Sequence, residues 1–196
     1  MIDNSEQIKS LMDFSIDGTF FMTSLYRRRK DQPKNTDQKS DNILIKDYFI
    51  KSLEDFDKKY PEIKSLCDYF NARAYIRLNR CFYDKVAMET LAIIVEYMQK
   101  GNLHNVKAAY TTACGRRCYD PEKKWVIDID EDIDEWRVEQ IIQASKSGFE
   151  NIIIAKIPTV NGVHFITHPF DKRTLDWEFP DIVHKSNPTL LYHNKL

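Results

Sequence analysis

The second half of the chain alternates between apolar runs with strand spacing and one run with helix spacing. The predicted strands are residues 125–130, 151–157 and 163–167, with shorter candidates at residues 182–183 and 190–192. Residues 134–146 place their apolar side chains three or four positions apart, which predicts a helix. Asn161-Gly162 is typical of a tight turn, so the two strands on either side of residues 158–162 are predicted to form a hairpin.

The first half of the chain has mainly helical spacing. The predicted helices are residues 1–14, 43–60, 63–70 and 82–98, and the predicted strands are residues 19–26 and 72–78. Pro61 is expected to end the second of these helices, and the polar residues 31–42 predict a loop. Core packing most simply explains the apolar stripe of the last helix, which consists of Val86, Leu91, Ile94, Val95 and Met98.

These elements predict an α+β protein with a mostly antiparallel sheet and helices packed on one face. A chain of 196 residues fits a single domain. Within that domain, residues 1–120 are expected to form an N-terminal α/β part. Residues 121–196 are expected to form an α+β part that carries the candidate chemistry.

Charge and composition exclude some functions and leave others open. The chain has 29 Lys+Arg against 30 Asp+Glu, so a protein that coats nucleic acid through an overall basic charge is disfavoured and any polyanion site must be local. No apolar run is long enough to span a membrane, and the N-terminus lacks the pattern of a signal peptide. Four cysteines are too few for a disulfide scaffold, so we expect a cytoplasmic protein.

The most informative stretch is the acidic end of the strand at residues 125–130. Alternation on a strand directs Asp128 and Asp130 to the same face, about 6.6 Å apart along the strand. Two carboxylates at this spacing could serve a pair of metal ions about 3.5–4 Å apart, and oxygen ligands suit Mg²⁺ or Mn²⁺. A solvent-facing strand side with no bound metal is the structural alternative. Asp132, Asp134 and Glu135 are better explained as residues at the start of the following helix.

The predicted hairpin turn offers groups that could bind an anion. His164 lies just inside the outgoing strand, where its side chain could reach a ligand held over the sheet. Thr159, Asn161 and the backbone N–H groups around Gly162 are possible donors. His164 and His168 are about 13 Å apart on a strand, so they cannot hold one metal ion together. An ordinary edge histidine is the alternative interpretation of His164.

Several basic groups are candidate phosphate ligands. Arg73 and Arg77 are predicted to point the same way from one strand, and Arg116 follows Cys114-Gly115 in a segment whose cysteine spacing does not indicate zinc. The run Arg27-Arg28-Arg29-Lys30 also has the composition of a phosphate-binding cluster, although such runs are commonly solvated ends of elements.

In chain order, Asp128-Ile129-Asp130, a helix, a strand and Thr159-Val160-Asn161-Gly162-Val163-His164 resemble the catalytic core of the archaeo-eukaryotic primase superfamily. The viral and plasmid primase-polymerases are the most similar branch, and the resemblance covers residues 125–185. It implies that Asp128 and Asp130 ligate the catalytic divalent metals, and that His164 contacts the triphosphate of the incoming nucleotide. Gly162 stands where many members have serine.

The family also has a later motif, an apolar residue followed by Asp, which would supply a third catalytic carboxylate. Asp181 in Phe179-Pro180-Asp181-Ile182 is the best match, and Asp171 and Asp176 are the other possibilities.

The resemblance therefore implies a metal-dependent nucleotidyltransferase that uses Mg²⁺ or Mn²⁺ and a nucleoside triphosphate. It would act on single-stranded nucleic acid, with replication proteins as possible partners, and His164 with Arg73, Arg77 or Arg116 would hold the triphosphate. Two alternatives remain open. One is a catalytically inactive module on the same fold that binds nucleic acid or protein, and the other is a metal-dependent nuclease that uses the same carboxylates.

Overall fold

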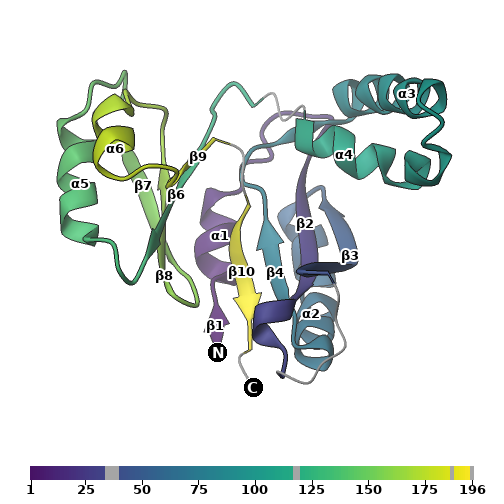
Figure 1. Ribbon diagram of the computed structural model, residues 1–196, viewed down its shortest axis with the longest axis horizontal. Helices are drawn as coiled ribbons and strands as arrows, with labels where there is room; N and C mark the ends of the chain where they lie inside the picture. Colours follow the sequence, from purple (N-terminus) through teal and green to yellow (C-terminus); the bar gives the residue numbers. More distant parts are fainter. Residues whose placement is uncertain (34–39, 117–119, 186–187, 195–196) are drawn as a thin grey trace.

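The computed structural model describes residues 1–33, 40–116, 120–185 and 188–194, and it contains two antiparallel β-sheets (Figure 1). The first sheet has the strand order β1 (Ile2–Asp3), β10 (Thr189–His193), β4 (Arg73–Ile76), β2 (Thr19–Arg28) and β3 (Asn42–Ile50), and β5 (Cys81–Phe82) pairs with β2. The second sheet has the order β7 (Ile153–Pro158), β8 (Gly162–Thr167), β6 (Trp125–Asp130) and β9 (Val183–His184). The expected α+β class is therefore confirmed, with two sheets in place of one.

Helices cover three sheet faces. On one face of the first sheet, α1 (Ser5–Leu11) and α2 (Leu53–Phe70) share an apolar core with β2 and β4. On one end of its other face lie α3 (Tyr83–Gln99), the 3-10 helix η2 (Leu103–Ala108) and α4 (Ala109–Arg116), while the 3-10 helix η1 (Arg29–Asp31) follows β2. The outer face of the second sheet packs against α5 (Glu135–Ala144) and α6 (Arg173–Glu178). The expected packing of helices on one face only is therefore confirmed for the second sheet and wrong for the first, which has helices on both faces. Among the described helices, none combines the length and the apolar character needed to cross a membrane.

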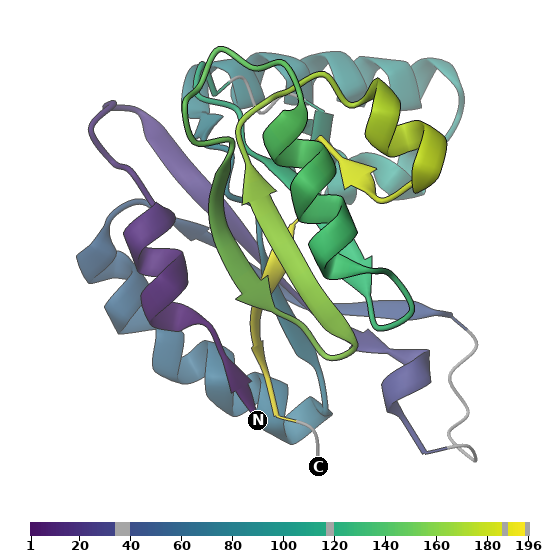
Figure 2. The same cartoon turned by 90° about the vertical axis from the view of Figure 1, so that its left-hand side faces the viewer.

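The two sheets share one core. Val126, Ile157 and Ile166 point from the second sheet into the same cluster as Ile8 of α1 and Leu191 of β10. In Figure 2, which views the molecule from the side of the second sheet, the β7–β8 hairpin lies in front of strands of the first sheet. Because β10 returns from the second sheet to pair with β1 and β4, the expected boundary at residue 120 does not separate the two sheets.

The elements predicted in the second half are confirmed, whereas the helix predicted at residues 43–60 is wrong in its first part and confirmed from Leu53 onward. Residues 42–50 form β3, which pairs with β2 along its whole length. Ile45 and Phe49 have helical spacing, but a register shift in the pairing with β2 lies beside Ile45, and the two side chains pack on opposite faces of the first sheet. The long-range pairing with β2 therefore decided that this segment is a strand, because its local sequence pattern does not distinguish a strand from a helix.

Of two further expectations about helices, one is wrong and one is confirmed only in part. Pro61 lies inside α2 and does not end it, and Ser52 caps the helix by accepting a hydrogen bond from the Asp55 N–H at 3.0 Å. In α3, the stripe residues Val86 and Ile94 pack with Ile93 into the core that includes α4, whereas the stripe residues Leu91, Val95 and Met98 are exposed. The helix therefore buries only part of the predicted apolar stripe.

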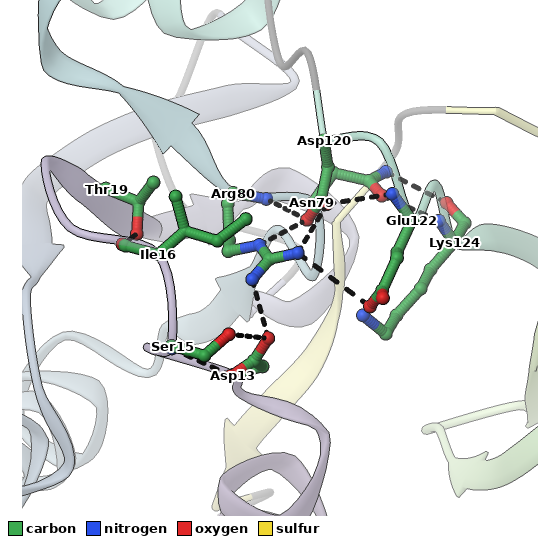
Figure 3. A network of polar contacts seen from close by, with 9 residues as sticks. All are labelled: Asp13, Ser15, Ile16, Thr19, Asn79, Arg80, Asp120, Glu122 and Lys124. Atoms are coloured by element: carbon green, nitrogen blue, oxygen red, sulfur yellow. Dashed lines mark hydrogen bonds and ion pairs between the residues drawn. The ribbon is translucent and has the colours of Figure 1, made fainter.

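A buried ionic network ties the β4–β5 connection to the segment that enters β6 (Figure 3). The Arg80 guanidinium donates to both carboxylate oxygens of Asp120, at 2.9 and 2.8 Å, and to Asp13 at 2.6 Å. Beside it, Asn79 exchanges two hydrogen bonds with the Lys124 backbone, at 2.8 and 2.7 Å. Because Lys124 precedes β6 and Arg80 follows β4, this network fixes the first sheet relative to the second.

Candidate functional site

A cavity of about 480 Å³ lies between the two sheets. One wall comes from the first sheet and η1, the other from β6, β8 and the β7–β8 turn. Its lining residues are mainly polar or charged: Tyr26, Arg28, Lys30, Asn42, Arg73, Tyr75, Asp128, Asp130, Thr159, Asn161, His164, Pro188 and Leu190. Most of the residues predicted to bind metal or nucleotide therefore line this one cavity, although they come from segments far apart in the sequence.

The acidic wall is formed by β6. Asp128 and Asp130 share the inner face of this strand, as the alternation predicted, because Ile127 and Ile129 point into the core beneath α5 and α6. Asp128 is half-buried and Asp130 is exposed. The strand thus presents two carboxylates to the cavity while its other face anchors it.

His164 is the cross-strand neighbour of Asp128 and is almost fully buried. Its Nε2 lies 3.1 Å from Asp128 Oδ1, and its Nδ1 lies 2.9 Å from the hydroxyl of Thr189 on β10. The hydrogen bond from His164, opposed by partial burial, holds the pKa of Asp128 below its usual value. The structure therefore assigns His164 a clear contact with Asp128, and Thr189 links this pair to the first sheet.

The basic wall is formed by the end of β2, by η1 and by β4. Arg28 donates a hydrogen bond to the Tyr75 hydroxyl at 2.9 Å, and the buried Arg73 forms a two-point ion pair with Asp31. Desolvation lowers the pKa of Lys30, and the positive charges of Arg28 and Arg73 lower it further, while Asp31 and Asp130 act in the opposite direction. Three cations thus face the two carboxylates of β6.

The turn between β7 and β8 closes one end of the cavity. Thr159 and Asn161 line it, and the Thr159 N–H donates to the Gly162 carbonyl at 2.9 Å, so the predicted hairpin is confirmed. Gly162 pairs with Asp130, and a Cβ atom at this position would lie 2.0 Å from the Ile129 carbonyl oxygen. Glycine is therefore required for β8 to approach β6 beside the acidic pair.

Four predicted site residues are not among those that line this cavity: Gly162, which lies in the turn beside it, and Arg77, Arg116 and Asp181. Arg77 is half-buried, with its guanidinium near Gly115, and Arg116 pairs with Glu96 of α3 at 3.3 Å. Asp181 has a positive φ of 67° and lines a separate pocket of about 360 Å³ with Asp176. The expected roles of Arg77 and Arg116 in holding a triphosphate, and of Asp181 as a third carboxylate, are not supported by their positions.

Several residues that were not predicted for the site line the cavity or interact with its residues, and some of them had a signal in the sequence. Arg28 and Lys30 belong to the basic run that could also have been a solvated end, and Tyr75 shares the predicted strand face of Arg73. His184 stands on β9 opposite Val126, on the same face as Asp128, and helps to lower the pKa of Asp128, but it lines the separate pocket of Asp181 and not this cavity. Thr189 had no local signal, because only the return of β10 to the first sheet brings it to His164.

The donors at the acidic wall are chemically suited to Mg²⁺ or Mn²⁺. Within the described residues, no group of three His, Cys, Asp or Glu side chains is arranged to hold a metal ion. Mg²⁺ commonly takes only one or two carboxylates and completes its shell with water and substrate phosphates. Asp128 and Asp130, with a basic wall opposite for the phosphates, fit that mode of binding.

The chain matches none of the protein-family models, curated proteins or solved structures to which it was compared. Its function must therefore be sought in the geometry and chemistry of the cavity and in the sequence motifs that line it.

Proposed function

We propose that this protein is a metal-dependent nucleotidyltransferase. In this proposal it binds a nucleoside triphosphate in the cavity between the sheets and adds nucleotides to a nucleic-acid strand, in the manner of a small primase-polymerase of phage or mobile-element type. The supporting observation is one cavity in which Asp128 and Asp130 face Arg28, Lys30 and Arg73. A metal–triphosphate complex needs these two kinds of groups at opposite ends of one site.

Each group would have a defined role. Asp128 and Asp130 would hold divalent ions, which when bound activate a 3′-hydroxyl and neutralise the leaving pyrophosphate. His164 would keep the Asp128 carboxylate ionised and oriented through the contact at 3.1 Å. Arg28 and Lys30 would bind phosphate oxygens, and Thr159 and Asn161 would donate hydrogen bonds from the turn.

Arg73 would act less directly than the sequence suggested. One edge of its guanidinium, Nε and Nη2, already donates to the two carboxylate oxygens of Asp31, and the pair is largely buried. This ion pair holds η1 beside β4, which keeps Lys30 at the edge of the cavity. We therefore assign Arg73 to positioning the basic wall.

One observation favours the inactive alternative. The strand beside β6 carries His184 on the face of Asp128, and the carboxylate proposed for a third motif, Asp181, lies in another pocket. A protein with this arrangement could bind nucleotide or single-stranded nucleic acid without polymerising it. The two functions differ in whether metal-dependent binding leads to strand extension.

The decisive experiment is calorimetry of nucleoside triphosphate binding with and without Mn²⁺. The Asp128→Asn/Asp130→Asn variant is expected to lose at least about 100-fold in Mn²⁺-dependent affinity, since removal of even outer-shell groups costs roughly 10–100-fold. Asp181→Asn is the matched control, because this carboxylate lies outside the cavity and asparagine tolerates its positive φ. The control is expected to bind like the wild type.

Wild-type protein that binds no triphosphate with Mn²⁺, or a double variant that binds as tightly as the wild type, contradicts the proposed site. If binding is confirmed, a labelled primer–template distinguishes the reactions, because a polymerase lengthens the strand, a nuclease shortens it and an inactive module leaves it unchanged. Salt-sensitive binding to single strands that Asp128→Asn does not weaken would support the inactive module.

A further inference from the structure

The cavity between the sheets has an apolar side to which the proposed function gives no role. Tyr26, Tyr75, Pro188 and Leu190 line it, and all four lie on the first sheet or directly before β10. Both tyrosine rings are half-buried, and neither belongs to the apolar core clusters of the described residues. Core packing therefore does not explain these two rings, and a metal ion with its phosphates does not use an aromatic surface.

Tyr26 and Tyr75, which we call the tyrosine pair, have a geometry that suits a flat aromatic ligand. Their ring centroids are 6.4 Å apart and the ring planes are inclined at 56°. A flat ring that stacks on one tyrosine therefore meets the other at an angle, and both arrangements are favourable between aromatic groups. Arg28 donates a hydrogen bond to the Tyr75 hydroxyl at 2.9 Å, and the buried Leu190 pairs with Tyr75 across β10 and β4. Tyr75 is thus held in place before any ligand binds.

The tyrosine pair and the basic wall follow each other along the strands. Tyr26 precedes Arg28 by two residues on β2, and Tyr75 follows Arg73 by two residues on β4. Because β2 and β4 are antiparallel, each tyrosine lies farther from η1 than the arginine of its own strand. A nucleotide has the same order, with charged phosphates at one end and a flat base at the other. Small-molecule sites commonly measure about 300–1,000 Å³, so a cavity of about 480 Å³ has room for one such ligand.

We propose that the tyrosine pair binds the nucleobase of the triphosphate by stacking, so that the cavity selects nucleoside triphosphates over other polyphosphates. This inference rests on the proposed function, because the metal ions and the basic wall place the phosphates. An unpaired base of a single strand offers the same flat face to a tyrosine. The experiment therefore has separate arms for a free nucleotide and for a strand.

Calorimetry with Mn²⁺ compares adenosine triphosphate with inorganic triphosphate, which lacks the base. The wild type is expected to bind adenosine triphosphate about 5–150-fold more tightly, the fold-change that corresponds to the stacking of one base. Tyr26→Leu/Tyr75→Leu removes both rings and retains apolar side chains, so this ratio of affinities should fall at least about fivefold. Tyr26→Phe/Tyr75→Phe retains both rings and should restore the wild-type ratio, although it removes the hydrogen bond from Arg28.

Tyr69→Leu is the matched control, because Tyr69 is 81% exposed on α2 and does not line the cavity. It should keep the wild-type ratio, and thermal melts followed by circular dichroism check that all the variants remain folded. A wild type that does not favour adenosine triphosphate, or a leucine double variant that keeps the wild-type ratio, overturns the stacking and leaves the metal–triphosphate site standing. Wild-type protein that binds neither ligand overturns the proposed function, and the stacking with it.

Proton NMR with Mg²⁺ tests the stacking without any variant. The adenine protons of the bound nucleotide should move upfield, because the face of an aromatic ring shields the nuclei above it, and no upfield shift would contradict the stacking. In the strand arm, binding of a labelled oligothymidylate is measured for the wild type and the leucine double variant. If the variant weakens oligothymidylate binding but keeps the ratio for the two triphosphates, the tyrosine pair binds a strand, and its assignment to the free nucleotide is overturned.

Discussion

The Arg80 network and the cavity both bring acidic and basic side chains together from distant segments, but they treat those charges differently. In the network, Arg80 is 2% exposed and Asp120 is 1% exposed, and short hydrogen bonds join them directly. In the cavity, Asp128 and Asp130 lie on one sheet, while Arg28 and Lys30 extend from the other. The network joins its opposite charges directly, whereas among the described residues no ion pair joins the two β6 carboxylates to Arg28 or Lys30.

This difference separates a structural role from a binding role. A buried charge without a partner is costly, so the network can persist only as a complete set of pairs. Charges that line an open cavity remain hydrated and available to a ligand that carries both signs, as a metal–triphosphate complex does. Substitutions in the network should therefore change the free energy of unfolding, and substitutions in the cavity should change binding.

The largest effect is expected for Arg80→Met. This substitution leaves the Asp120 carboxylate buried without its guanidinium partner, and breaking such a pair costs about 3–5 kcal/mol of the free energy of unfolding. Denaturant unfolding followed by fluorescence measures the loss. Arg116→Met removes an arginine whose ion pair with Glu96 is largely exposed, so this control should lose no more than about 1 kcal/mol.

The pH dependence of Arg80→Met tests the same cause. In the wild type, burial raises the pKa of Asp120, but the hydrogen bonds from Arg80 outweigh this and keep it below its usual value. The stabilisation by this pair is therefore present above the unfolded pKa of about 3.9 and is lost as the pH falls through the lower folded pKa. In the variant, burial without Arg80 raises the folded pKa of Asp120 above its unfolded value, so the variant gains stability as the pH falls through that pKa. The difference in stability should therefore begin to narrow above about pH 4 and narrow further below it. A difference that is constant with pH would assign the loss to packing.

An intermediate effect is expected for Arg28→Gln/Lys30→Gln. Hydrogen bonds to charged groups are each worth about 1.5–3 kcal/mol, so Mn²⁺-dependent triphosphate affinity should fall by at least about tenfold with little change in the free energy of unfolding. Arg29→Gln is the matched control, because Arg29 belongs to the same basic run but does not line the cavity. If Arg29→Gln lost as much triphosphate affinity as Arg28→Gln/Lys30→Gln, the loss would come from the general positive charge of this run and not from contacts made inside the cavity.

The smallest effect is expected for Thr189→Val. The lost hydroxyl contacts His164 Nδ1 at 2.9 Å, and a buried hydrogen bond is worth about 1 kcal/mol, so affinity for the metal-bound triphosphate should fall several-fold. Thr189→Ser keeps the hydroxyl and should behave as the wild type. Nitrogen NMR of the His164 imidazole reports the protonation of each ring nitrogen. Identical spectra for Thr189→Val and the wild type would rule out this positioning role.

The candidate site was partly predictable because some of its geometry is local. Asp128 and Asp130 were expected on one strand face, and β6 has the bounds predicted for it. The order of a strand, a helix and a hairpin that carries His164 on its second strand was also predicted. The basic wall could be predicted only in part: Arg73 reached the cavity, but Arg77 and Arg116, which had similar local support, did not.

By itself, the sequence determined the elements whose side-chain pattern is set within a few residues: the acidic strand, the capped helix after it and the hairpin turn. Only the tertiary structure decided that residues 42–50 are a strand, that Thr189 returns to His164, and that Arg28 and Lys30 face the carboxylates. Side-chain periodicity is a property of neighbouring residues and fixes which face a group occupies. The partner across that face depends on strand pairing and on the contact between the sheets, which join residues from separate segments of the chain.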